Sequence, residues 1–459
     1  MIGQIFLILA SLVFYAWWDI RYLPLLLGSV IVNFTISQFL SPDSGVRPYY
    51  RKILLILGIV SNLSVLCYFK YFDFFLNNSN FFLGTNWEIL NLALPLAISF
   101  FTLQQIAFLV DVYEGLTKEK RFLNYLLFVS FFPQLIAGPI VHHRAMMPQF
   151  DNLRNRFLNY QNISKGLFIF SMGLFKKVMI ADQLEIYSSA FYSDPAALSV
   201  IDAWLASYLF AFQLYFDFSG YSDMAIGLGL LFNIKLPLNF NSPFKANNII
   251  DFWRRWHITL GDFIRTYVFS ALLRTRKKVT YLYSLWALFM AMLLLGIWHG
   301  ASWNFFFFGL IHAFGVITHS LWQKTNIRLN TFVSWFLTLN FVIVSLIFAS
   351  ADTTQNAFIA LSKMFFIDRV AFDIGSTLSM LDLTSVCDVD TLIFSCDMLR
   401  HMNILFLAAA ILCVFFTKNA YEWMEQQKPT LFYIVFNLFL FLIPIIFISE
   451  VKEFIYFQF

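Results

Sequence analysis

The chain has 459 residues, of which 59% are hydrophobic and only 13% are charged. A soluble domain is about 45–50% apolar and about 25% charged, so both fractions depart from the soluble pattern in the direction of a membrane protein. A disordered chain is excluded, because low hydrophobicity is its signature. The net charge of +4, spread over this length, gives no reason to expect a nucleic-acid partner. The composition therefore predicts an all-α, polytopic membrane protein.

Apolar segments recur along the whole chain. A spanning helix needs about 20 mostly apolar residues, and windows of this kind predict about nine to twelve transmembrane helices. The first basic residue is Arg21, so the N-terminus lacks the start of a cleaved signal peptide and the first window is expected to remain as a membrane helix. The windows lie at 2–18, 22–40, 53–70, 89–110, 122–140, 164–190, 198–216, 279–298, 303–322, 331–350, 403–417 and 430–449.

The window at 122–140 contains Pro133, Gly138 and Pro139, which interrupt helices. We expect a broken, re-entrant segment here, which a membrane tolerates only where protein covers the exposed backbone. The chain shows no internal repeat and no low-complexity linker. Residues 1–459 are therefore predicted to form one membrane domain.

Two polar blocks indicate the orientation in the membrane. Residues 245–278 carry eight Lys or Arg against two Asp, and residues 351–400 carry three against seven Asp. The positive-inside rule places the basic block on the cytoplasmic side, so the acidic loop is expected to face outward. Cys387 and Cys396 lie in that loop and are able to pair in an oxidising compartment. The four cysteines form no spaced zinc site, and no metal site is predicted.

Residues 250–272 of the basic block are amphipathic at helical period, with Arg254, Arg255, Asp262 and Arg265 on the polar side. Such a helix either lies in the membrane interface, as a plain surface anchor does, or lines a partly wet cavity. Its apolar arc is predicted to consist of Trp253, Trp256, His257, Leu260, Phe263, Ile264, Tyr267, Val268 and Ala271.

Histidines are the main candidates for chemistry. Residues 279–323 contain no Asp, Glu, Lys or Arg, yet they include His299, His312 and His319. An ionisable side chain at membrane depth is a functional hypothesis, and histidine has the pKa best suited to general-base work near neutral pH. His299 stands out because of its setting, G-I-W-H-G-A-S-W, in which glycines allow close approach and Trp298 and Trp303 offer an apolar wall. His312 and His319 have no such frame and are expected to be packing residues.

Two other features allow both a structural and a functional interpretation. His257 is either a satisfied buried histidine or a second polar group that orients substrate near His299. Asp217 and Asp223 flank Ser219-Gly220 and either orient a histidine or serve turn formation and capping, which we favour. There is no H-E-x-x-H helix, Walker A loop, G-x-S-x-G elbow or dinucleotide fingerprint, which argues against hydride transfer and ATP-driven work.

Several motifs, in family order from about Leu94 onward, resemble the membrane-bound O-acyltransferase superfamily. The closer likeness is to its bacterial branch, which contains the membrane subunits of alginate and peptidoglycan O-acetylation, and the teichoic acid D-alanyl transferase is a more distant relative. The motifs are L-P-L-A-I-S-F-F-T at 94–102, F-F-P-Q-L-I-A-G-P-I at 131–140, G-L-F-K-K-V at 173–178, Y-F-D-F-S-G-Y-S-D-M-A-I-G at 215–227, D-F-W-R-R-W-H-I-T-L at 251–260, G-I-W-H-G-A-S-W at 296–303 and the terminal F-I-Y-F-Q-F at 454–459.

The resemblance implies a ring of membrane helices around a central tunnel. The active-site histidine of the family maps onto His299, and its accompanying polar histidine maps onto His257. The implied chemistry is acyl transfer, with His299 as general base and a cytoplasmic thioester, expected to be acetyl-coenzyme A, as donor substrate. No resident cofactor or metal is expected.

The terminal motif implies a further step. In the related D-alanyl system, a small partner carries a similar C-terminal motif whose Tyr is implicated as an acyl carrier. We therefore expect Tyr456 to receive the acyl group and pass it to an outer-face partner, a transferase with a Ser-His-Asp site, for delivery to an envelope or exported polysaccharide. The enzyme would lie in the inner membrane of a bacterial cell. The structural alternative is that 454–459 is an aromatic interfacial anchor.

Other functions fit parts of the sequence. A transporter of polysaccharide or lipid-linked sugar would also have many spans and intramembrane histidines, but it predicts internal pseudo-symmetry, which we do not find. A non-catalytic membrane scaffold for the outer transferase is the third hypothesis. Within the family, the alternative reaction is D-alanyl transfer to teichoic acid.

Overall fold

The computed structural model describes residues 2–185, 188, 195–365, 408, 410–428, 430–448 and 454–455. All regular secondary structure in these residues is helical, which confirms the all-α prediction. His401, Cys387, Cys396 and most of the predicted acidic loop lie outside the described residues.

Five helical segments within this part of the chain are long and apolar enough to cross a membrane, which is fewer than predicted. One reason is that several predicted windows form helices of 17 residues or fewer, among them Ile98–Tyr113 and Leu431–Phe447. The five segments are Gly3–Leu40, Pro48–Leu83, Tyr281–His299, Trp303–Trp322 and Thr331–Ser350.

The internal contacts of the chain define two compact units. Unit 1 comprises Met1–Phe170, Ala225–Leu238 and Asp262–Arg274, and unit 2 comprises Ser171–Met224, Asn239–Gly261 and Thr275–Phe459. We describe each unit by itself. The single membrane domain predicted for 1–459 stays a prediction.

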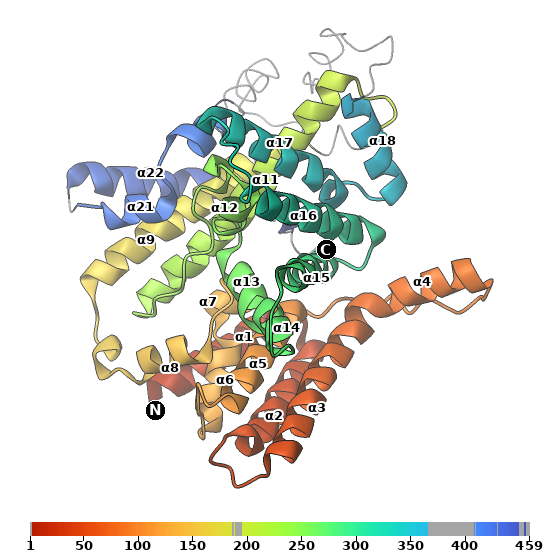
Figure 1. The fold of residues 1–459 in the computed structure, drawn as a ribbon. Helices are drawn as coiled ribbons and strands as arrows, with labels where there is room; N and C mark the ends of the chain where they lie inside the picture. The colour runs from red at the N-terminus through yellow and green to blue at the C-terminus, as the bar shows by residue number, and fades with distance from the viewer. Residues whose placement is uncertain are drawn as a thin grey trace. The chain divides into compact units, whose positions relative to one another are not determined.

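Unit 1 is built mainly from the first third of the chain. Helix α3 contacts α2 and α5, and α1 contacts α6, as the red and orange ribbons of Figure 1 show. The side-chain amides of Asn33 on α2 and Asn62 on α3 hydrogen-bond to each other at 2.6 and 3.1 Å, which supplies polar adhesion between two apolar helices. The helices are α1 (Ile2–Asp19), α2 (Leu23–Leu40), α3 (Pro48–Leu66), α4 (Phe72–Leu83), α5 (Ile98–Tyr113), α6 (Phe122–Ser130), α7 (Phe132–Leu135) and α8 (His143–Asp151).

The segment at 122–140 is broken, as predicted. Helix α6 ends at Ser130, the single turn α7 follows, and the next residues are not helical. The side-chain amide of Gln134 donates to the carbonyl oxygen of Phe128 at 2.9 Å, so it satisfies a backbone group close to the break. At Gly138 a Cβ atom would lie 2.9 Å from the carbonyl oxygen of Gln134, so only glycine fits this tight return of the chain.

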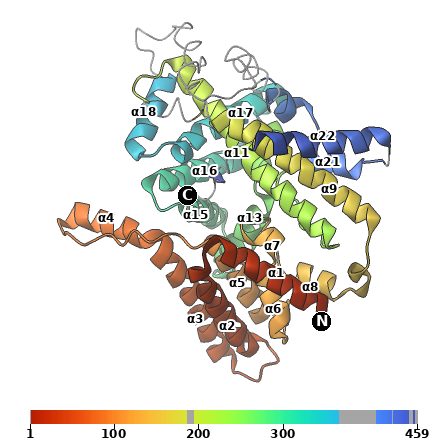
Figure 2. The same cartoon turned by 180° about the vertical axis from the view of Figure 1, so that it is seen from behind.

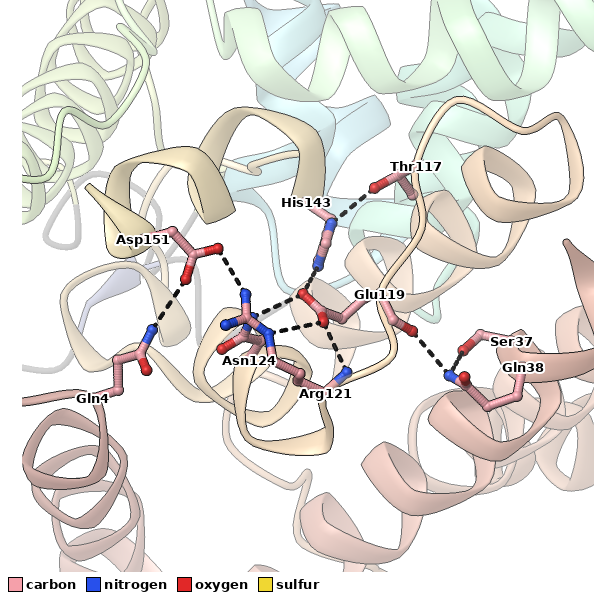
Figure 3. Close-up of polar contacts among 9 residues, drawn as sticks. All are labelled: Gln4, Ser37, Gln38, Thr117, Glu119, Arg121, Asn124, His143 and Asp151. Atoms are coloured by element: carbon pink, nitrogen blue, oxygen red, sulfur yellow. Dashed lines mark hydrogen bonds and ion pairs between the residues drawn. The ribbon is translucent and has the colours of Figure 1, made fainter. Parts of the chain in front are cut away.

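A buried polar network joins the loop after α5 to the start of α8 (Figure 3). His143 lies with Nδ1 2.9 Å from the Thr117 hydroxyl and Nε2 3.4 Å from the Glu119 carboxylate. Burial alone would raise the pKa of Glu119, but hydrogen bonds from His143, the Arg121 backbone and Asn124 outweigh it and lower the pKa. The network therefore fastens the broken segment to the α5–α6 loop through a charged carboxylate.

The remaining helices lie mostly in unit 2: α9, α11 and α13 contribute residues to both units, and α14 belongs to unit 1. Figure 2 shows α9 and α11 from behind, in yellow and yellow-green. The helices are α9 (Tyr160–Phe175), α11 (Val200–Leu231), α12 (Ile249–Trp253), α13 (Ile258–Phe263), α14 (Ser270–Arg274), α15 (Tyr281–His299), α16 (Trp303–Trp322), α17 (Thr331–Ser350), α18 (Thr354–Phe365), α21 (Ala420–Glu425) and α22 (Leu431–Phe447).

Within unit 2, α9 and α11 cross at a pair of glycines. A Cβ atom at Gly220 would lie 2.7 Å from the carbonyl oxygen of Gly173, and a Cβ atom at Gly173 would overlap the carbonyl oxygen of Gly220. Small residues at such a crossing allow helix backbones to touch. The π-helical turn Lys176–Ala181 follows directly, so the crossing brings Lys176 and Lys177 against the 217–223 stretch of α11.

The continuous amphipathic helix predicted for 250–272 is wrong. Helix α12 ends at Trp253, a turn occupies 254–257, α13 begins at Ile258, and a π-helical segment covers Ile264–Phe269. The break falls at His257, whose φ of +44° cannot continue a right-handed helix. Periodicity did not reveal the break because the apolar spacing continues across it.

Candidate active site

His299 is the last residue of α15 and is 8% exposed. Its Nδ1 lies 2.7 Å from the carbonyl oxygen of Leu295, one helical turn earlier. A carbonyl oxygen only accepts hydrogen bonds, so Nδ1 must carry the proton. In the neutral imidazole the lone pair is then on Nε2, which is the atom that can act as a base.

The motif around His299 supports close packing of two helices. A Cβ atom at Gly309 on α16 would lie 3.0 Å from the Cα of Gly296 on α15, so the two backbones meet one turn before the histidine. A Cβ atom at Gly300 would overlap the ring of Phe305. The absence of side chains at these glycines therefore lets the α16 backbone and the Phe305 ring approach α15 closely, as the motif predicts.

Aromatic rings surround the His299 imidazole. The ring centroids of Trp298, Phe308 and Phe305 lie 5.1, 5.8 and 6.4 Å from it. Trp303, predicted to belong to this wall, is 44% exposed and packs on Phe306 instead. Phe305 and Phe308 take its place because they face α15 from the first turns of α16.

His257 is fully buried in the turn between α12 and α13. Its left-handed backbone conformation is uncommon for a residue with a side chain, and such strain concentrates at functional sites. Burial lowers the pKa of His257, and the charge of His299 lowers it further. The charge of His299 therefore acts on His257, and the orienting role of His257 near His299 stays a prediction.

Asn239 was not predicted from the sequence, and it holds the His257 turn in place. Its Oδ1 lies 3.1 Å from Nδ1 of His257 and accepts the hydroxyl hydrogen of Thr259 at 2.9 Å. Its Nδ2 donates to the hydroxyl of Ser222 on α11 at 3.2 Å, and its carbonyl oxygen accepts from the N–H of Ile258. An amide oxygen accepts, so Nδ1 of His257 is also the protonated nitrogen.

Asp217 and Asp223 do neither of the things considered from the sequence. Helix α11 runs unbroken through both residues, so they are not at a turn or cap. Asp223 pairs with Lys176 at 2.6 Å, and Asp217 pairs with Lys177 at 2.6 Å. The two lysines follow Gly173 in the sequence, but no spacing rule connects them to carboxylates about 40 residues away.

The C-terminal motif reaches this region of unit 2. The backbone N–H of Ile455 donates to Oδ2 of Asp217 at 2.9 Å, and the ring of Phe454 packs on Tyr221 and Phe218. Phe218 in turn packs edge-on against His257, with ring centroids 4.8 Å apart. Tyr456, the predicted carrier, lies outside the described residues.

The family model that matches the chain is that of the membrane-bound O-acyltransferases, over residues 118–360. The chain belongs to this family. Its histidine motif, its buried His257 turn and the helices that hold them all lie within or beside the matched region.

This acyltransferase resembles curated bacterial proteins over most of its length. It is 46% identical to a peptidoglycan O-acetyltransferase of Helicobacter pylori over 390 residues, which is 79% of this chain and 73% of the relative. It is 35% identical to a probable alginate O-acetylase AlgI of Pseudomonas aeruginosa over 370 residues, 79% of this chain and 69% of the relative. A teichoic acid D-alanyltransferase of Bacillus subtilis is 30% identical over 245 residues, 51% and 61% of the two chains. The chain is thus a multi-pass membrane O-acyltransferase.

The other histidines in the described part of the acyltransferase have structural partners. His312 joins α16 to α17, because its Nε2 lies 2.9 Å from the hydroxyl of Ser345. His319 contacts Gln323 one turn later on the same helix. His142 in unit 1 shares the hydroxyl of Tyr267 with Asp111. The prediction that His312 and His319 are packing residues agrees with these contacts.

Metal chemistry receives no support from the described part of the acyltransferase. Within those residues, no group of three or more His, Cys, Asp or Glu is arranged to hold a metal ion. The described cysteines, Cys67 and Cys413, are both free thiols. The expectation that no metal takes part stays a prediction.

Replacing Asn239 tests whether it positions His257. We expect Asn239→Leu to lower acyl transfer about tenfold, the scale seen when a residue that orients a histidine is removed. Asn239→Asp should restore much of the rate, because a carboxylate oxygen accepts the same hydrogen bonds. The measurement is kcat and KM for labelled donor in detergent-solubilised enzyme of matched yield. Equal loss in both variants would contradict a positioning role.

Proposed function

We propose that this acyltransferase moves an acetyl group from cytoplasmic acetyl-coenzyme A across the bacterial inner membrane for O-acetylation of an envelope or exported polysaccharide. The observation that carries the proposal is the Nδ1 contact of His299, which leaves the basic nitrogen Nε2 in an aromatic, water-poor setting. The names of two relatives, a peptidoglycan O-acetyltransferase and a probable alginate O-acetylase, support acetyl as the group transferred.

The proposed reaction begins at the hydroxyl of Tyr456. Nε2 of His299 takes the phenolic proton while the oxygen attacks the thioester carbonyl. The C–S bond then breaks, and the departing coenzyme A thiolate takes the proton back from the imidazolium. The products are a tyrosyl acetate ester and free thiol, and the base is restored. No resident cofactor or metal is needed for this step.

The residues around His299 favour this reaction over hydrolysis. Trp298, Phe305 and Phe308 form an apolar wall, and excluding water from an acyl donor prevents wasteful hydrolysis. His257, whose pKa is lowered by burial, is expected to stay neutral and to hold substrate by hydrogen bonding. Its proposed role is positioning, while His299 carries the proton.

The acetyl group then leaves on the outer face. A partner transferase with a Ser-His-Asp site takes it from Tyr456 by a second acyl transfer and delivers it to the polysaccharide. The tyrosyl ester is a suitable intermediate because phenolate is a better leaving group than a sugar alkoxide. Basic residues 245–278 on the cytoplasmic side are consistent with donor entry from within.

Labelling of the enzyme by its expected donor tests the proposal directly. Purified enzyme is incubated with isotope-labelled acetyl-coenzyme A, and the C-terminal peptide is analysed by mass spectrometry. We expect acetyl on the peptide that contains Tyr456, and ester-linked acetate on polysaccharide from cells with the gene intact. If D-alanine rather than acetate appears on polymers of a deletion-complemented strain, the acetyl assignment is wrong and the D-alanyl alternative is right.

A further inference from the structure

Asp217 on α11 is a fully buried carboxylate whose two oxygens have different partners. Oδ1 pairs with Nζ of Lys177 at 2.6 Å, and Oδ2 accepts the backbone N–H of Ile455 at 2.9 Å. A buried charge is costly unless both a counter-ion and hydrogen bonds satisfy it. The C-terminal segment therefore completes the solvation of a charge that α11 carries in the interior.

Lys177 is itself held on the opposite side. Its Nζ lies 2.9 Å from Oδ1 of Asp182, one turn further along the same segment. The order is thus Asp182, Lys177, Asp217 and then the backbone of Ile455. A charged acceptor makes the last hydrogen bond about twice as strong as a neutral one.

Phe454 adds an apolar contact between the C-terminal segment and α11. Its ring stacks on Tyr221 with centroids 5.1 Å apart and lies 5.4 Å from Phe218. Phe218 also packs on the His257 ring, with centroids 4.8 Å apart. One aromatic side chain therefore contacts both the tail residue Phe454 and His257.

We propose that Asp217, paired with Lys177, and the aromatic pair Phe218 and Tyr221 form a docking site for the C-terminal segment of the chain. The carboxylate binds a main-chain N–H, which any residue except proline offers, and the rings accept an aromatic side chain one position earlier. The site therefore recognises an aromatic residue followed by a non-proline residue in the terminal segment. Its role in presenting Tyr456 rests on the carrier function proposed above, whereas the site itself rests on the contacts.

The docking site explains two motifs of the sequence together. G-L-F-K-K-V supplies Gly173 for the helix crossing and Lys177 for the ion pair, and Y-F-D-F-S-G-Y-S-D supplies the carboxylate, both rings and Gly220. The neighbouring pair of Lys176 and Asp223 has the same 2.6 Å separation. Of the terminal motif the structure describes Phe454 and Ile455, and the hydrogen bond from Ile455 goes to Asp217.

Cysteine labelling tests the docking site in the full-length enzyme. Ile455, which is 5% exposed, is replaced by cysteine in a chain whose four native cysteines are alanine, and labelling by a water-soluble maleimide is timed in detergent. Asp217→Ala is expected to speed labelling about tenfold or more, the change that loss of a hydrogen bond to a charged group gives. Asp182→Ala is the matched control, because each variant leaves Lys177 one carboxylate and only Asp217→Ala removes the acceptor of the tail.

The outcomes separate docking from catalysis. Faster labelling in Asp217→Ala alone supports the docking site, whereas equal rates in both variants, fast or slow, overturn it. Trimming of the native-cysteine chain by a carboxypeptidase gives the same comparison if the cysteine-free chain is unstable. If the tail is released and acetyl transfer continues at the wild-type rate, the docking site stands and the carrier function of Tyr456 fails.

Discussion

Replacing His299 by alanine is expected to lower acyl transfer about 10²–10⁴-fold, the contribution typical of a positioned general base. The reason is geometric: the backbone carbonyl of Leu295 fixes the proton on Nδ1, so Nε2 is the nitrogen that accepts a proton from the attacking hydroxyl. The measurement is transfer of labelled acetate from acetyl-coenzyme A by purified enzyme, with protein amount matched by immunoblot.

The matched control for this variant is His319→Ala. His319 lies on α16 in the same stretch without charged residues, and its ring hydrogen-bonds to Gln323 one turn away. We expect its transfer rate to remain close to that of the wild type. Near-wild-type transfer by His299→Ala would instead indicate that the chain is a scaffold for catalysis elsewhere.

Replacing Tyr456 by phenylalanine is expected to abolish acetylation of the polysaccharide while membrane abundance is unchanged. The two side chains have nearly the same shape, so an interfacial anchor would tolerate the change. The phenolic oxygen is the atom that forms the ester, and phenylalanine lacks it. The measurement is ester-linked acetate released by mild base from purified glycan.

Tyr421→Phe provides the control, because Tyr421 belongs to α21 and plays no part in the proposed chemistry. It removes one phenolic hydroxyl from the same chain and should leave glycan acetate unchanged. Normal glycan acetate in Tyr456→Phe would remove the carrier step and leave the terminal motif as an anchor.

Predictions that rested on single proline or glycine residues were confirmed, whereas the prediction that rested on hydrophobic periodicity was wrong. The break in the segment 122–140 was predicted correctly, because proline and glycine change the conformation of their own backbone. The glycines around His299 were also understood, since a missing Cβ has the same consequence in any fold. The amphipathic helix at 250–272 was wrong, because a period counts residues and does not detect a single left-handed conformation at His257.

Pairings between distant segments were beyond the sequence. Asn239 belongs to no motif, yet its side-chain and backbone oxygens accept hydrogen bonds from His257, Ile258 and Thr259, and its Nδ2 donates to Ser222. Trp303 is the last residue of the histidine motif but is 44% exposed, while Phe308, nine residues after His299, packs on the imidazole. Side-chain direction depends on where the next helix begins, which is a matter of packing.

The sequence by itself determined that this is an all-α membrane acyltransferase and made His299 the candidate base, because composition, apolar length and a specific motif are local properties of the chain. Only the tertiary structure decided which charges meet. From the sequence, Asp217 was a candidate for turn formation or for a histidine partner. In the structure, α9 and α11 cross at Gly173 and Gly220, and Asp217 pairs with Lys177 and accepts the N–H of Ile455. The energetic effect of a buried charge depends on its ion-pair and hydrogen-bond partners. Those partners lie on segments that only the packing of the chain brings together.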